Sequence, residues 1–131
     1  MKLLIYSRQD RGIIKSIEQV ITALGGDINM EHARDQKEFK HASKFCYTGE
    51  TLVVFFVDKK TDMAFLESVE MDFMDIKLVI YLGDKETDLI VRAYKLYPRV
   101  VTGAFDKDDL LLAAVKGILL NLMGARRIMN G

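Results

Sequence analysis

The six residues LVVFFV at positions 52–57 form a continuous hydrophobic block with no polar interruption. β-Branched and aromatic side chains fill it, and a block of this length without alternation is typical of a strand covered on both faces, as in a parallel sheet. Residues 3–6 (LLIY) and 78–82 (LVIYL) have the same character. The sequence therefore predicts three buried parallel strands at these positions.

Two weaker segments complete the predicted sheet. Residues 28–33 alternate between apolar and polar side chains, which fits an edge strand with one wetter face. Residues 100–105 are the last candidate, although Gly103 lies inside the segment.

Between the strand candidates the hydrophobic period changes to that of a helix. The clearest stripe spans residues 13–24 and is followed by Gly25-Gly26 as a stop, and a second spans residues 89–97 and ends before Pro98. Weaker stripes predict helices around residues 35–46, which contain Phe45 and Cys46, and 62–73, which end on Phe73. A final helix is predicted to begin at Asp106, with Asp109 three residues later near its positive end.

Strand followed by helix, repeated five times, predicts an α/β fold: a three-layer sandwich with a five-stranded parallel sheet and helices on both faces. We find no internal repeat and no linker rich in Pro, Gly or Ser. One domain over residues 1–123 is expected, with residues 124–131 as a C-terminal tail.

Composition excludes several classes of function. Lys and Arg total 19 and so do Asp and Glu, so the net charge is zero and nucleic acid is not expected as a partner. The single cysteine rules out an internal disulfide. Apolar stretches are far shorter than the roughly 18 residues that span a membrane, and the N-terminus does not resemble a secretory signal. We expect a soluble cytoplasmic protein that does not bind membranes.

The order of these segments resembles the receiver domain of bacterial response regulators (CheY-like), which has a flavodoxin-like (βα)5 fold of about this length. Residues 1–6 resemble the first strand of that family, and residues 51–56 resemble its third strand. Asp62 lies where the following loop of the family often has an aspartate. The best local match is residues 104–110 (AFDKDDL), which are similar to the stretch that opens the last helix of the family.

The resemblance implies a phosphoryl-transfer site of five groups at the carboxyl ends of the strands. In that family two acidic residues hold Mg²⁺, an aspartate accepts phosphate, and a hydroxyl and a lysine complete the site. In this sequence the acidic pair is replaced by Ser7 and Arg8. The remaining positions fall on Phe56 for the acceptor, Gly83 for the hydroxyl, Gly103 for the lysine and Val100 for the aromatic switch. The resemblance is therefore to a degenerate receiver without a working phosphorylation site, and no cofactor, metal or enzymatic activity is expected.

A shift of two residues would place Asp58 at the acceptor position, with Asp84 and Asp10 in neighbouring loops, but it supplies no matching lysine. Open α/β sheets bind ligands at this carboxyl edge. Arg8 is expected there either as an anion-binding fork or as an exposed loop residue. The candidate carboxyl-edge residues are Ser7, Arg8, Asp10, Asp58 and Asp84. If they act chemically, the chain is a small flavodoxin-like enzyme or a phospho-carrier.

The last helix is apolar over more of its circumference than one sheet contact needs, which favours association with a partner protein or a second copy as a homodimer. Tyrosine and arginine near the same edge are of types enriched at interface hot spots, although Tyr97 fits the core stripe equally well. The candidate interaction surface consists of Tyr94, Tyr97, Arg99, Leu112, Leu119, Leu120 and Met123. The function predicted is a phosphorylation-independent, receiver-like interaction module in bacterial signalling or regulation.

Overall fold

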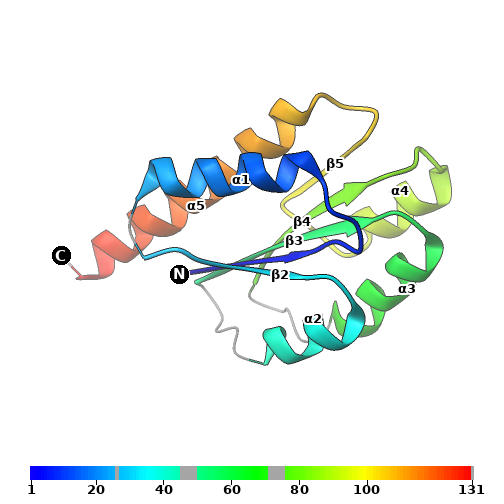
Figure 1. Cartoon of the computed structure of the whole chain (residues 1–131), viewed down its shortest axis with the longest axis horizontal. Coiled ribbons are helices and arrows are strands. Elements are labelled where there is room, and N and C mark those ends of the chain that lie inside the picture. Colours follow the sequence, from blue (N-terminus) through cyan, green and yellow to red (C-terminus); the bar gives the residue numbers. More distant parts are fainter. Residues whose placement is uncertain (26, 45–49, 71–75, 131) are drawn as a thin grey trace.

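A computed structural model of the chain describes residues 1–25, 27–44, 50–70 and 76–130, with the backbone alone for residues 125–130. Its centre is one sheet of parallel strands in the order β2-β1-β3-β4-β5 (Figure 1). The strands are β1 (Lys2–Tyr6), β2 (Asn29–Ala33), β3 (Thr51–Val57), β4 (Lys77–Leu82) and β5 (Val100–Gly103).

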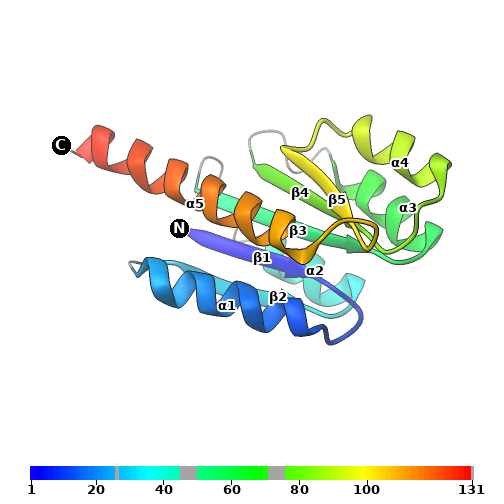
Figure 2. The same ribbon diagram turned by 90° about the horizontal axis from the view of Figure 1, so that it is seen from above.

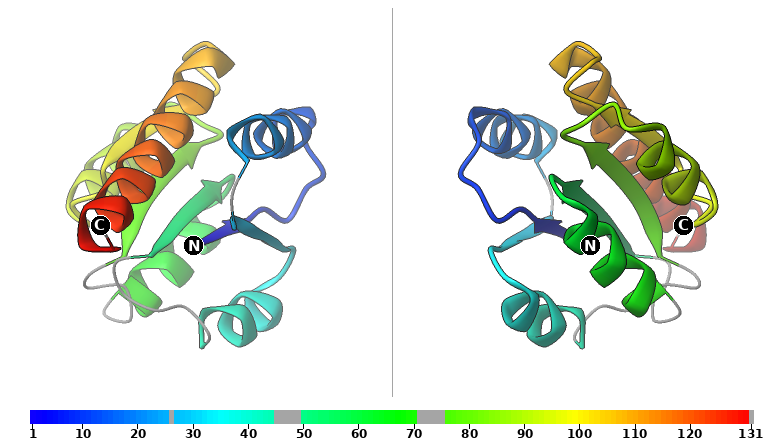
Figure 3. Two further views of the ribbon diagram at one scale, coloured as in Figure 1. Left: turned by 90° about the vertical axis from the view of Figure 1, so that its left-hand side faces the viewer. Right: turned by 90° about the vertical axis from the view of Figure 1, so that its right-hand side faces the viewer.

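Helices cover both faces of this sheet. They are α1 (Gly12–Leu24), α2 (Gln36–Ser43), α3 (Lys60–Val69), α4 (Thr87–Tyr94) and α5 (Asp108–Asn130). Helices α1 and α5 lie on one face, and α2, α3 and α4 lie on the other (Figure 3). The three-layer (βα)5 architecture predicted from the sequence is confirmed.

Strand β3 is the middle of the sheet, and all of its residues are buried. It pairs with β1 on one side and with β4 on the other. Because side chains alternate along a strand, β3 contributes to both hydrophobic cores. Val53, Phe55 and Val57 face α2, α3 and α4, whereas Leu52, Val54 and Phe56 face α1 and α5. The hydrophobic block at residues 52–57 therefore does what its uninterrupted pattern predicts.

Several element boundaries differ from the prediction. Helix α4 ends at Tyr94, and Tyr97 adopts a positive φ of 53° with its side chain 91% exposed, so Tyr97 lies outside the core stripe. Strand β5 ends at Gly103. Helix α5 begins at Asp108 rather than Asp106, whose carboxylate instead accepts a hydrogen bond from Thr102 Oγ1 at 3.0 Å.

Parts of the predicted helices 35–46 and 62–73 lie outside the described residues, including Phe45, Cys46 and Phe73. The backbone of α5 stays helical to Asn130, so residues 124–130 of the segment expected as a tail continue that helix (Figure 2). The domain boundary after residue 123 stays a prediction. Within the described part of the chain, none of the helices combines the length and apolar character needed to cross a bilayer.

Candidate functional site

Asp58 is the first residue after β3 and lies at the carboxyl edge of the sheet. Its neighbour across the ladder is Gly83, whose backbone N–H donates to Val57 O at 2.8 Å. Phe56, which the resemblance to receiver domains placed at the acceptor position, is buried in the core beneath α1 and α5. Because its side chain points into that core, Phe56 does not present a group at the carboxyl edge. The alternative register, with Asp58 at the acceptor position, stays a prediction; the structure places Asp58 at the carboxyl end of β3.

Arg11 holds the carboxylate of Asp58 in an ion pair between Nη2 and Oδ1. Arg11 directly precedes α1, and its guanidinium carbon lies 5.0 Å from the ring centroid of Phe56 and 5.6 Å from that of Tyr81. Aromatic faces attract a cation at this range, so the two rings fix the guanidinium beside the carboxylate. Arg11 Nε also donates to Ser7 Oγ at 3.3 Å. The remaining oxygen of Asp58, Oδ2, is buried without a hydrogen-bond partner.

A second arginine binds a second carboxylate at the same edge. Arg8 Nε and Nη2 donate to the two oxygens of Asp62 at 2.7 and 2.8 Å, a bidentate geometry. Asp62 is only 2% exposed, and its Oδ2 also accepts from the backbone N–H groups of Asp58 and Lys59, both at 3.0 Å. Burial raises the pKa of Asp62, but the hydrogen bonds from Arg8 and from the two backbone amides outweigh burial, so its pKa is lowered overall.

Tyr6 adds a neutral donor to this cluster. Its hydroxyl lies 3.4 Å from Asp62 Oδ1, and its ring stacks on Phe55 with centroids 4.3 Å apart. Burial, and then the charge of Asp62, raise the pKa of Tyr6 to about 12. The hydroxyl therefore stays protonated at neutral pH, and Asp62 is fully enclosed by donors.

The resemblance places the hydroxyl position on Gly83 and the lysine position on Gly103, and both glycines are closely packed. A Cβ placed on Gly83 would lie 2.6 Å from Asp58 Oδ1. A Cβ placed on Gly103 would lie 2.4 Å from Leu82 O and 2.6 Å from Cε1 of Phe105, whose ring fills the space where a lysine side chain would start. These are closer than real Cβ contacts, so side chains at either position would require local rearrangement.

The residues at this edge do not fit the Mg²⁺ that the fold implies. A hard divalent cation takes six or more oxygen ligands, with carboxylates prominent among them. Ser7 and Arg8 follow β1, and the two carboxylates nearest to them, Asp58 and Asp62, are each paired with a guanidinium. No group of three or more His, Cys, Asp or Glu side chains suited to a metal ion occurs among the described residues.

Of the candidate carboxyl-edge residues, the structure brings Ser7, Arg8 and Asp58 together and leaves Asp10 and Asp84 exposed. Asp10 is 85% exposed and pairs with Arg34 at 3.3 Å. Arg8 was expected either as an anion-binding fork or as an exposed loop residue; its guanidinium pairs with the carboxylate of Asp62, within the same chain. The roles of Arg11 and Asp62 were not foreseen, although the place of Arg11 immediately before the first helical stripe was a usable signal.

The candidate interaction residues divide between surface and core. Tyr94 is 60% exposed, Tyr97 91% and Leu120 46%, Arg99 is exposed, and Leu112 and Met123 are partly buried. Leu119 is fully buried against the sheet, so its assignment to a surface was wrong. The stripe of α5 that packs on the sheet consists of Leu111, Val115, Leu119 and Leu122.

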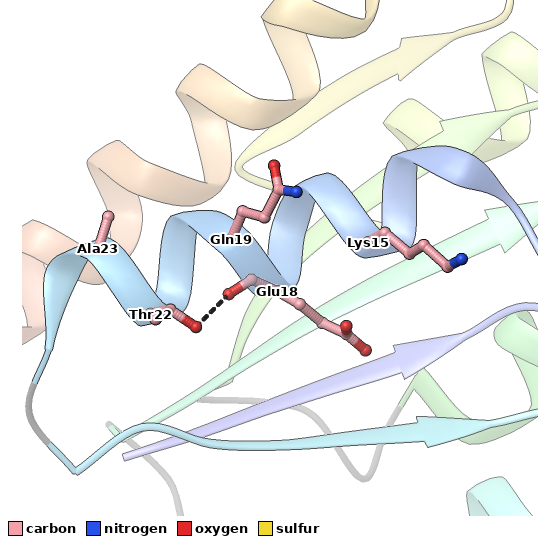
Figure 4. A pocket seen from close by; sticks show the side chains of 5 residues that line it. All are labelled: Lys15, Glu18, Gln19, Thr22 and Ala23. Carbon is pink, nitrogen blue, oxygen red and sulfur yellow. Dashed lines mark hydrogen bonds between the residues drawn. The ribbon is translucent and has the colours of Figure 1, made fainter.

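A shallow surface hollow on α1 lies away from this edge. Figure 4 shows its lining, which consists of Lys15, Glu18, Gln19, Thr22 and Ala23, all from the one helix. Its internal hydrogen bond runs from Thr22 Oγ1 to Glu18 O at 3.0 Å. The lining brings together no cluster of catalytic or ligating groups.

No protein-family model and no curated protein sequence matches the chain. Solved structures do match its fold. A CheY-like receiver domain from Methanospirillum hungatei superposes with a TM-score of 0.71 at 17% identity, covering 95% of this chain and 97% of that one. The receiver domain of an HD domain-containing protein from Pseudomonas fluorescens gives 0.72 at 17% identity, with coverages of 94% and 97%. A pilus assembly protein from Sinorhizobium meliloti gives 0.60 at 15% identity, with coverages of 88% and 97%. The chain therefore has the fold of response regulator receiver domains.

Proposed function

We propose that this chain is a receiver-type protein-interaction module that works in bacterial signalling or regulation without being phosphorylated. The observation that carries the proposal is the ion pair between Arg11 and Asp58. Transfer of a phosphoryl group to Asp58 needs an accessible carboxylate and cations that neutralise the phosphoryl oxygens. Here the carboxylate is already engaged by Arg11 and partly buried, with a side chain 14% exposed.

The glycines at the hydroxyl and lysine positions support the same proposal. A phosphoryl group on Asp58 would find neither a hydroxyl at Gly83 nor an amine at Gly103 to bind its oxygens. A receiver fold that lacks these groups can still act by binding other proteins through its surface. We therefore propose a non-enzymatic role in the cytoplasm.

Exposed apolar side chains indicate where a partner would bind. Val91 and Tyr94 project from α4, Tyr97 follows that helix, and Leu110 and Leu120 lie on α5. Both helices pack against β5, the last strand of the sheet. We propose that this region binds a protein partner or a second copy of the chain rather than nucleic acid, since the net charge of zero supplies no excess of cations.

Incubation with acetyl phosphate and Mg²⁺, followed by intact-mass measurement, tests the first half of the proposal. We expect no gain of a phosphoryl group, whereas a competent receiver domain treated in parallel gains one. A gain that disappears in Asp58→Asn would overturn the proposal and establish the alternative, a phospho-carrier that uses the carboxyl edge. A gain that persists in Asp58→Asn would locate the modification on another residue and would equally overturn the proposal that the chain works without being phosphorylated.

A further inference from the structure

The two arginines at the carboxyl edge carry positive charge at the place where the fold family implies a metal ion. Arg8 reaches Asp62 and Arg11 reaches Asp58, so each pair joins the segment after β1 to the segment after β3. A divalent cation bound between carboxylates of these segments would make the same connection. We infer that the guanidinium groups of Arg11 and Arg8 are built-in replacements for the divalent cation and exclude it from this edge.

The surroundings of Arg11 support a fixed cation rather than a mobile surface charge. Its side chain is 19% exposed, its guanidinium lies over two aromatic rings, and Nε contacts Ser7 Oγ. By contrast, the pair between Arg34 and Asp10 is open to solvent, with side chains 57% and 85% exposed. The guanidinium of Arg11 is therefore desolvated and held by several contacts at once.

Arg11 contacts only one of the two carboxylate oxygens of Asp58. Oδ1 is neutralised by Arg11, but Oδ2 is buried without a hydrogen bond. An unpaired buried carboxylate oxygen costs free energy, and a small hard cation with a water shell would satisfy both oxygens. Removal of Arg11 would free Asp58 Oδ1 and Ser7 Oγ, the two side-chain oxygens that its guanidinium now contacts. The inference is thus that Arg11 blocks a latent cation site.

Arg11→Glu tests this directly, because it exchanges the blocking charge for a second carboxylate. Lys15→Glu is the matched control, since it makes the same charge change one turn later at an exposed position of α1. Tb³⁺, a hard trivalent ion, is the probe, read by luminescence sensitised through nearby tyrosines, and Mg²⁺ is tested by thermal unfolding. We expect Arg11→Glu to bind Tb³⁺ and to gain about 3–5 °C in Tm with saturating Mg²⁺. Wild type and Lys15→Glu should show neither effect.

Two results would overturn the inference: stoichiometric binding of Tb³⁺ or Mg²⁺ by the wild type that is lost in Asp58→Asn, or a folded Arg11→Glu that binds no more Tb³⁺ than Lys15→Glu. If Arg11→Glu does not fold alone, it is refolded with Mg²⁺ and with a chelator. Recovery only with Mg²⁺ supports the inference, and equal failure in both overturns it.

This inference stands apart from the proposed function. Wild type that takes phosphate from acetyl phosphate on Asp58 but binds no metal would overturn the proposed function and leave the inference standing. Wild type that binds metal without taking phosphate would overturn the inference alone.

Discussion

Asp62 is the most enclosed charge at the carboxyl edge. Arg8, two backbone amides and the hydroxyl of Tyr6 all direct donors at its carboxylate. A buried charge is tolerated only with such a complete set of partners, and removal of one partner leaves the other uncompensated. At the level of single residues, the pair between Arg8 and Asp62 is therefore where stability is most sensitive.

Arg8→Ala should lower the free energy of unfolding by about 3 kcal/mol, the lower end of the range for a broken buried pair because Arg8 itself is partly exposed. Urea unfolding followed by circular dichroism measures this loss. The control is Arg34→Ala, which removes an exposed pair with Asp10 and should cost about 0.5 kcal/mol or less. Equal losses in the two variants would contradict the assignment of a buried pair.

The lowered pKa of Asp62 predicts the behaviour in acid. Because its folded pKa lies below its unfolded value, the unfolded chain binds the proton first as the pH falls. The stabilisation is complete above about pH 4 and is lost as the pH drops through the folded pKa. The free energy of unfolding should therefore fall less steeply below pH 4 in Asp62→Asn than in wild type. Glu67, whose pKa Arg92 lowers, contributes to the slope of both proteins. Parallel curves would show that Asp62 is not the responsible group.

At the scale of elements, the end of β5 is closely packed around a glycine, Gly103. Gly103 closes the strand, and the turn that follows returns the ring of Phe105 over it. Only glycine fits between that ring and the carbonyl of Leu82. The ring of Phe105 therefore packs against Gly103 within the turn between β5 and α5, and it occupies the space that a lysine side chain at this position would need.

Gly103→Ala should destabilise the fold by about 1–3 kcal/mol, since the new methyl group meets a backbone oxygen that cannot move alone. Gly117→Ala is the matched substitution on α5, where nothing lies within 4 Å of the new Cβ. It should stabilise the protein by about 0.5–1 kcal/mol through helix propensity. Thermal unfolding of both variants measures these changes in stability, which should have opposite signs. An unchanged Tm in Gly103→Ala would contradict this prediction and would mean that the Phe105 ring moves aside at little cost.

At the scale of the whole molecule, the two helices that flank β5 combine core and surface roles. Leu119 is buried against the sheet, whereas the adjacent Leu120 is 46% exposed and points away from that contact. Exposed leucine, valine and tyrosine side chains on α4 and α5 would each contribute to an interface through the burial of apolar area. Substitutions at these two adjacent positions of α5 can therefore affect folding and association separately.

Leu120→Glu should convert a self-associated protein to a monomer without lowering Tm by more than a few degrees. Size-exclusion chromatography with light scattering measures the mass, and Asn121→Glu at the neighbouring exposed position is the control that should stay associated. Leu119→Ala should instead cost about 2–5 kcal/mol of stability, as expected for a core leucine. Wild type that is monomeric at high micromolar concentration would contradict self-association and leave only a different partner protein.

The architecture was readable from the amino-acid sequence because hydrophobic periodicity is local. The block at residues 52–57 and the stripe at residues 13–24 encode buried strands and amphipathic helices within a few residues of themselves. The identity of several edge residues was also readable, since Ser7, Arg8 and Asp58 follow strands whose ends meet at one edge.

Which charges meet was decided only by the tertiary structure. Arg11 and Asp58 are 47 positions apart, and Arg8 and Asp62 are 54 apart, so their pairing depends on strand register and on the paths of two loops. The same holds for Leu119 and Leu120, because the rotation of α5 against the sheet decides which of the two is buried. Local pattern specifies the elements, whereas long-range contacts depend on how those elements are placed against one another.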